Sequence, residues 1–94
     1  MNRRVAVTGV GVIAPNGNDA VSFWASLMNG SSGIGPITLF DASTYPTRIA
    51  GEVKGFDPAG FMDRKQARRM ARFSQFAVVC ARMAVADAGL DEAA

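Results

Sequence analysis

The feature that most limits how this chain can fold is a stretch near its end that is apolar almost all the way round. The helical spacing of residues 73–88 puts apolar side chains on every face, namely Phe73, Phe76, Ala77, Val78, Val79, Cys80, Ala81, Met83, Ala84, Val85 and Ala86. Such a helix belongs inside a hydrophobic core. Because 94 residues offer little material to surround it, we expect the front portion of a larger protein, which does not fold well alone.

Residues 5–13 form a second apolar run, in which valines and an isoleucine are separated by small residues. A run of this kind is typical of a strand covered on both faces, as in a parallel or mixed sheet between helices. A dense group of turn residues at 14–18 ends it. The pattern predicts the first strand of an α/β protein.

A helix is expected to follow this turn, capped by Asn18 or Asp19 and closed by a left-handed Gly30. The apolar residues that should form its buried side are Phe23, Trp24, Leu27 and Met28. Residues 31–36 then predict a Gly/Ser loop. Polar and apolar residues alternate over 47–53, which predicts a half-exposed strand.

Two further helix signals flank residues 63–72. Asp57 before Pro58 is a good pair for the cap and first position of a short helical turn. Gly89 and Leu90 predict a Schellman-like end for the helix at 73–88. Both signals set boundaries for the elements on either side of this segment.

Residues 63–72 predict a short helix, capped by Asp63, that concentrates positive charge. At roughly 100° per residue, five cations fall within an arc of about 140°; they are Arg64, Lys65, Arg68, Arg69 and Arg72. These are half of the 10 Lys and Arg residues in a chain whose net charge is only +2. An acidic protein partner would offset their mutual repulsion. A solvated helix face and a nucleic-acid site are the alternatives, and the balanced charge elsewhere disfavours the second.

Two other patterns suggest sites that the residues support less well. Gly9 and Gly11 follow a predicted strand as in a dinucleotide fingerprint, with Asp41 as the ribose-binding acid, but residues 15–18 separate the glycines from the next helix. Close packing of the backbone explains these glycines better. Cys80 lies among apolar neighbours and is expected to be a buried structural thiol.

The absences narrow the function classes further. The chain has no histidine, which removes the commonest general base and metal ligand. One cysteine cannot form an internal disulfide and fits a reducing compartment. Neither a signal peptide nor a run of about 20 apolar residues is evident. We therefore expect no metal, no membrane association and a cytoplasmic location.

Five ordered blocks together resemble the amino-terminal part of a β-ketoacyl-acyl carrier protein synthase, the condensing enzyme of type II fatty acid synthesis. They are RRVAVTGVGVIAPNGN, FWASLMNGSSGIGPITLFD, TRIAGEVKGFDP, DRKQARRM and ADAGL, and they run from residue 3 to residue 90. The subfamily that the blocks resemble most is synthase II. Polyketide ketosynthases share the opening strand and the stretch QFAVVCAR, so they remain an alternative.

The resemblance implies a thiolase-like, layered αβαβα fold in an enzyme that is usually a homodimer. Residues 1–94 would be an incomplete part of its amino-terminal domain. The family extends an acyl chain by decarboxylative condensation with malonyl-acyl carrier protein, and uses a nucleophilic cysteine and two histidines. None of these falls within this chain, so we expect no catalytic residue here and no activity from these residues alone.

The same resemblance implies a role for the basic helix at 63–72. In the family this helix receives the acidic recognition helix of acyl carrier protein. Lys65, Arg68 and Arg69 match the docking positions, and Arg64 and Arg72 are expected to assist. No cofactor is implied, because the substrates travel on the phosphopantetheine arm of the carrier. A basic interaction module without chemistry, and a dinucleotide-binding domain, are the competing hypotheses.

Overall fold

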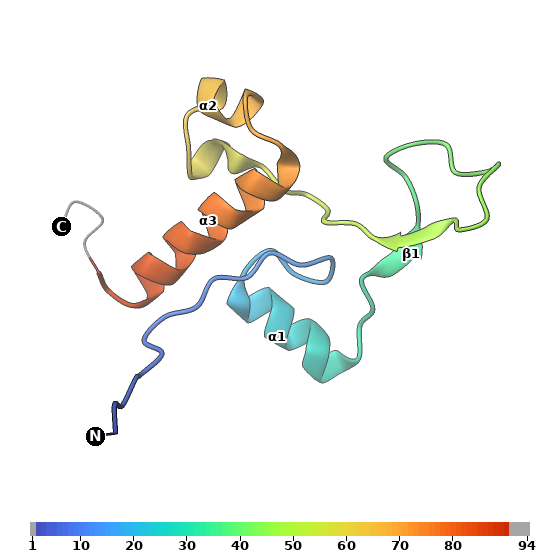
Figure 1. Cartoon of the computed structure of the whole chain (residues 1–94). Helices are drawn as coiled ribbons and strands as arrows, with labels where there is room; N and C mark the ends of the chain where they lie inside the picture. The colour runs from blue at the N-terminus through green and yellow to red at the C-terminus, as the bar shows by residue number, and fades with distance from the viewer. Residues whose placement is uncertain (1, 91–94) are drawn as a thin grey trace. The chain divides into compact units, whose positions relative to one another are not determined.

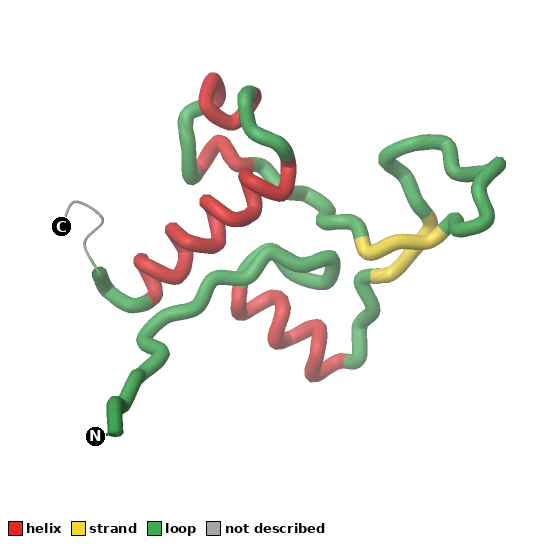
Figure 2. Tube along the Cα trace, viewed as in Figure 1, coloured by secondary structure: helices red, strands yellow, loops and turns green. Residues whose placement is uncertain are grey.

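The computed structural model describes residues 2–90 and contains short helices and one small sheet (Figures 1 and 2). In chain order the elements are α1 (Ala20–Asn29), β1 (Ile34–Pro36), β2 (Ile49–Gly51), the 3-10 turn η1 (Pro58–Gly60), α2 (Arg64–Arg68) and α3 (Arg72–Asp87). They belong to two compact units. One unit comprises residues 12–56, and the other combines the residues up to 11 with those from 57 onward.

In the unit of residues 12–56, α1 begins and ends where the sequence predicts. Oδ1 of Asp19 accepts a hydrogen bond from the backbone N–H of Ser22 at 2.7 Å, which satisfies a free amide of the first turn. At the other end Gly30 adopts a left-handed conformation, with φ 68°. The N–H groups of Gly30 and Ser31 turn back to carbonyls of α1, as in a Schellman motif.

The buried side predicted for α1 is not formed within the described residues. Trp24 is 62% exposed, Leu27 48% and Met28 69%, and only Phe23 is partly covered. A helix loses the exposure of its apolar stripe only when another element packs on it. No part of residues 2–90 covers this stripe, so the prediction is wrong for these three side chains.

Strands β1 and β2 pair antiparallel, with Gly35 opposite Ala50. The prediction of a strand over 47–53 is confirmed in a shorter form. The loop predicted over 31–36 is wrong for its second half, because Ile34–Pro36 supplies the partner strand. Ile34–Pro36 has a weak strand preference because it contains Gly and Pro, and it becomes a strand by pairing with β2.

The residues between these strands are held by a carboxylate. Glu52, only 8% exposed, accepts hydrogen bonds from the N–H and the hydroxyl of Thr38 and from the N–H of Leu39. Phe40 and Tyr45 meet edge to face nearby, with ring centroids 5.8 Å apart. Glu52 thus fixes the start of the loop that connects the two strands.

In the second unit, α3 confirms the helix predicted over 73–88. The N–H of Gly89 donates to the carbonyl of Ala86 and the N–H of Leu90 to that of Val85. This is the Schellman arrangement expected at that end. Burial of α3 is much less complete than predicted, since among the described residues of the helix only Val79 is fully buried.

Residues 5–13 do not form the predicted strand. In the described residues they have no β-ladder partner, and Val5 and Val7 are 93% and 83% exposed. A strand needs a neighbouring strand to satisfy its backbone. Part of the run instead packs against α3: a Cβ on Gly9 would collide with backbone of Ala84 and Ala88, and one on Gly11 with the carbonyl of Cys80.

The basic helix predicted over 63–72 is broken in two. Helix α2 contains only five residues, Arg69 ends it, and Ala71 is extended with ψ 154° before α3 begins at Arg72. One continuous helix would align Arg64, Arg68 and Arg72 at spacings of four residues, where like charges repel. The break removes Arg72 from that line, although no glycine or proline marks it in the sequence.

Candidate functional site

Four of the five predicted cations stay together on one turn of chain. Arg64, Lys65 and Arg68 belong to α2, and Arg69 is the residue that ends it. All four side chains are exposed. We call these four residues the basic cluster; Asp63 precedes it but makes no side-chain capping bond to α2.

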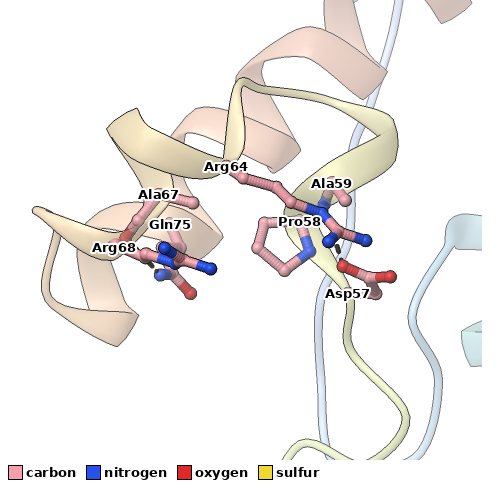
Figure 3. A pocket seen from close by; sticks show the side chains of 7 residues that line it. All are labelled: Asp57, Pro58, Ala59, Arg64, Ala67, Arg68 and Gln75. Atoms are coloured by element: carbon pink, nitrogen blue, oxygen red, sulfur yellow. Dashed lines mark hydrogen bonds between the residues drawn. The ribbon is translucent and has the colours of Figure 1, made fainter.

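A pocket of about 230 Å³ opens beside the basic cluster (Figure 3). Its lining consists of Asp57, Pro58, Ala59, Arg64, Ala67, Arg68 and Gln75. Arg64 and Arg68, one helical turn apart, extend their guanidinium groups along the same side of α2. Asp57 is engaged locally, because its Oδ1 caps η1 by accepting from the N–H of Ala59 at 3.0 Å.

The cations of the basic cluster form no close ion pair within the described chain, although the carboxylate of Asp57 lines the same pocket as Arg64 and Arg68. Within residues 2–90, no ion pair forms with Arg64, Lys65, Arg68 or Arg69 at the usual N–O limit of 4.0 Å. Lys65 and Arg68 lie in the last turn of α2, where the partial negative charge of the helix end favours cations. The helix end thus stabilises the cations at these positions. Because no ion pair in this described part of the chain engages them, they can still attract an anion from solution.

Arg72 has a different environment from the other four. It is the first residue of α3, and its guanidinium lies over the ring of Phe76 at 5.1 Å from the centroid. Arg72 also takes part in a further interaction within the structure. The predicted five-residue face is thus corrected to a cluster of four plus one arginine held by an aromatic ring.

The glycines of the apparent dinucleotide fingerprint have a packing role. Gly9 and Gly11 lie against carbonyl oxygens of Ala84 and Cys80 in α3, so no helix N-terminus faces them. A pyrophosphate needs N–H donors at that place. The packing explanation that the sequence favoured is confirmed.

Asp41 and Cys80 have ordinary environments. The carboxylate of Asp41 accepts from the N–H of Ser43, and this bond lowers the pKa of Asp41 below its usual value. Cys80 is half-buried, so its predicted burial is wrong in degree. Its backbone carbonyl lies against Gly11. Among residues 2–90, no three potential metal ligands gather, and no helix is both long and apolar enough to cross a bilayer.

Sequence reasoning missed Gln75. Its side-chain amide donates to the carbonyl of Ala67 at 2.8 Å and so joins α3 to α2 beside the pocket. The only signal in the sequence was its position as one of few polar residues in the otherwise apolar stretch 73–88.

Comparison with known proteins identifies the class. The family described as "Beta-ketoacyl synthase, N-terminal domain" matches residues 2–94. The chain therefore belongs to the β-ketoacyl synthase family, as the ordered blocks of its sequence predicted.

Two relatives within this family show which of its members the chain resembles. It is 53% identical over 88 residues to "3-oxoacyl-[acyl-carrier-protein] synthase 2" of Synechocystis sp., covering 94% of this chain and 21% of that protein. It is 51% identical to the protein of the same name from Coxiella burnetii, covering 95% of this chain and 22% of that one. The chain thus spans about a fifth of the length of these relatives.

A solved structure gives the fold. The chain of "The ishigamide ketosynthase/chain length factor" superposes with a TM-score of 0.88 at 42% identity, over 99% of this chain and 23% of that one. Residues 2–90 accordingly have the α/β arrangement of the amino-terminal portion of a ketosynthase, a thiolase-like fold. The predicted fold class is confirmed.

Proposed function

We propose that this chain is the carrier-docking, amino-terminal part of a 3-oxoacyl-[acyl-carrier-protein] synthase of the synthase II type. Such an enzyme accepts an acyl group as a thioester, condenses it with malonyl-acyl carrier protein, and releases carbon dioxide and a 3-oxoacyl carrier two carbons longer. The observation that carries the proposal is the 53% identity to a relative of that name over 94% of the chain.

The basic cluster supplies the chain's own part in this reaction. Its four exposed cations lack ion-pair partners within the described chain, so they attract an acidic carrier from solution. Association of this kind raises the encounter rate and sets the orientation of the partner more than it raises affinity. Arg64 and Arg68 line the same pocket, so their guanidinium groups are placed to bind a carboxylate side chain of the carrier.

The remaining expectations belong to the same proposal. The nucleophile and the acid–base residues lie outside these 94 residues, which contain no histidine. The substrates arrive on the phosphopantetheine arm of acyl carrier protein, and no resident cofactor takes part. The enzyme acts as a homodimer in the cytoplasm, without nucleic-acid or membrane partners.

The test uses the whole enzyme with carrier-linked substrates. Mass spectrometry should detect a 3-oxoacyl carrier extended by two carbons, and its absence with a well-folded enzyme contradicts the proposed reaction. Reversing charge in the double variant R68E/R69E should raise the KM for carrier-linked substrates about tenfold or more. The kcat/KM for a small thioester mimic should stay within twofold, whereas equal loss on both substrates would indicate misfolding.

Polyketide chain extension is the second candidate, favoured by the 42% identity to the ishigamide ketosynthase/chain length factor. Both duties use the same condensation, and they differ in how the 3-oxo group is processed afterwards. A synthase of fatty acids accepts saturated acyl carriers of increasing length, so a panel of saturated and unsaturated or oxidised acyl carriers separates the two duties. A module without chemistry would bind the carrier and form no product.

A further inference from the structure

The carbonyl oxygen of Ala67 receives two hydrogen bonds where α2 ends. The N–H of Met70 donates to it at 3.1 Å, which closes the last turn, and Nε2 of Gln75 donates to it at 2.8 Å from α3. Ala67 itself is 6% exposed. Both acceptor positions of this buried carbonyl are thus used, one by local chain and one by the next helix.

Helix α2 depends on such contacts for its position. It has five residues, and an isolated helix of that length is not stable in water. Asp63, which precedes it, adds no side-chain cap. The anchors that remain are the burial of Ala67 and Met62, the neighbouring turn η1, and the bond from Gln75.

We infer that Gln75 is a positioning residue for carrier docking, which it serves by holding α2 so that Arg64 and Arg68 border one pocket. This inference rests on the proposed function. Gln75 lines the same pocket as the two arginines, yet it carries no charge and its amide points to the Ala67 carbonyl (Figure 3). It acts through α2, and the partner need not touch it.

Loss of this bond should weaken docking by a limited factor. A neutral hydrogen bond contributes about 0.5–1.5 kcal/mol, which corresponds to a change of about two- to tenfold. Without this hydrogen bond, binding of the carrier should weaken, because α2 then samples other orientations. Its two arginines then no longer border the pocket together. Chemistry on a substrate that bypasses the carrier does not depend on this orientation.

The experiment compares two identical substitutions in the whole enzyme. Gln75→Met keeps the length of the side chain and removes the donor. Gln66→Met makes the same change on α2, where the exposed Gln66 side chain forms no hydrogen bond within the described chain. We expect Gln75→Met to raise the KM for acyl carrier protein substrates about two- to tenfold. The kcat, the kcat/KM for a small thioester mimic and the KM of Gln66→Met should stay within twofold of wild type.

Arg68→Glu, assayed in parallel, separates this inference from the proposed function. If Arg68→Glu raises the carrier KM and Gln75→Met does not, Gln75 has no positioning role and docking stands. If neither change affects the carrier KM, docking at α2 is itself wrong. A parallel loss of activity on carrier and small thioester in Gln75→Met also overturns the inference, because it indicates a general structural role.

Discussion

The backbone N–H of Val10 donates to Oδ2 of Asp87 at 3.0 Å, joining residues that lie 77 positions apart in the sequence. Asp87 is the last residue of α3, where a negative charge is unfavourable for the helix dipole. The bond to Val10 compensates for that placement. It also satisfies one amide of a segment that has no strand partner in the described chain.

Asp87→Ala should therefore loosen the segment around Val10. Replacing Asp87 leaves the amide of Val10 to water, so hydrogen exchange of peptides covering residues 5–13 should become faster, by about fivefold for a loss near 1 kcal/mol. Asp87→Asn keeps an acceptor oxygen and should retain most of the protection. Equal exchange in wild type and Asp87→Ala would contradict a bond at this place.

Gly11→Ala should destabilise the enzyme strongly. A Cβ at Gly11 would collide with the carbonyl of Cys80, which cannot move without displacing α3. Overpacking against backbone costs about 1–3 kcal/mol or more, so the thermal unfolding midpoint should fall by several degrees. Gly35→Ala is the matched control, because nothing lies within 4 Å of its added Cβ. A similar midpoint for both variants would argue against the packing of this segment on α3.

The stability of the loop after β1 should depend on pH through Glu52. The pKa of Glu52 lies below its usual 4.5, chiefly because the hydroxyl of Thr38 donates to the carboxylate. A lowered pKa means that the folded state favours the charged form. Its stabilising contribution is thus present above pH 4.5 and is lost as the pH falls through the folded-state pKa.

Amide exchange at Thr38 and Leu39 measures this dependence. After correction for intrinsic rates, protection should decrease in the wild type as the pH falls below 4.5. In Glu52→Gln, protection should be lower at neutral pH and should not change across that range. Protection in the wild type that stays constant with pH would show that Glu52 does not hold the loop.

Arg72 should matter less than Arg68 for the carrier. The guanidinium of Arg72 is held over Phe76 and lies outside the basic cluster, whereas Arg68 lines the pocket. We expect Arg68→Ala to raise the carrier KM about threefold or more and Arg72→Ala to change it by less than twofold, in line with the small energy of single exposed ion pairs. A larger increase in the carrier KM for Arg72→Ala than for Arg68→Ala would support the single five-residue face that the sequence predicts.

The sequence predicted the features that are local. Asp19 and Gly30 delimit α1, and Gly89 closes α3, because caps depend on a few neighbouring residues. The family followed from ordered blocks of sequence. The docking role of Lys65, Arg68, Arg69, Arg64 and Arg72 stays a prediction. It remains a prediction that residues 1–94 are an incomplete domain that does not fold well alone.

The features that failed depend on distant contacts. The strand over 5–13 requires neighbouring strands, and the buried side of α1 requires a covering layer, neither of which residues 2–90 supply. At the break between α2 and α3, the Ala67 carbonyl accepts hydrogen bonds from Met70 and from the distant Gln75, and no residue type in 63–72 indicates this break. Gln75 was missed for the same reason, since a lone glutamine in an apolar helix has no characteristic motif.

The affinity of the whole enzyme for acyl carrier protein at low ionic strength tests the docking claim most directly. The triple variant K65A/R68A/R69A removes three cations of the basic cluster, and R3A/R4A/K54A removes three exposed cations elsewhere, so both have the same net charge. We predict that the first raises the Kd, measured by fluorescence anisotropy, at least about tenfold and flattens its salt dependence. The second should stay within twofold of wild type. Equal affinities for wild type and both variants would contradict carrier docking at α2.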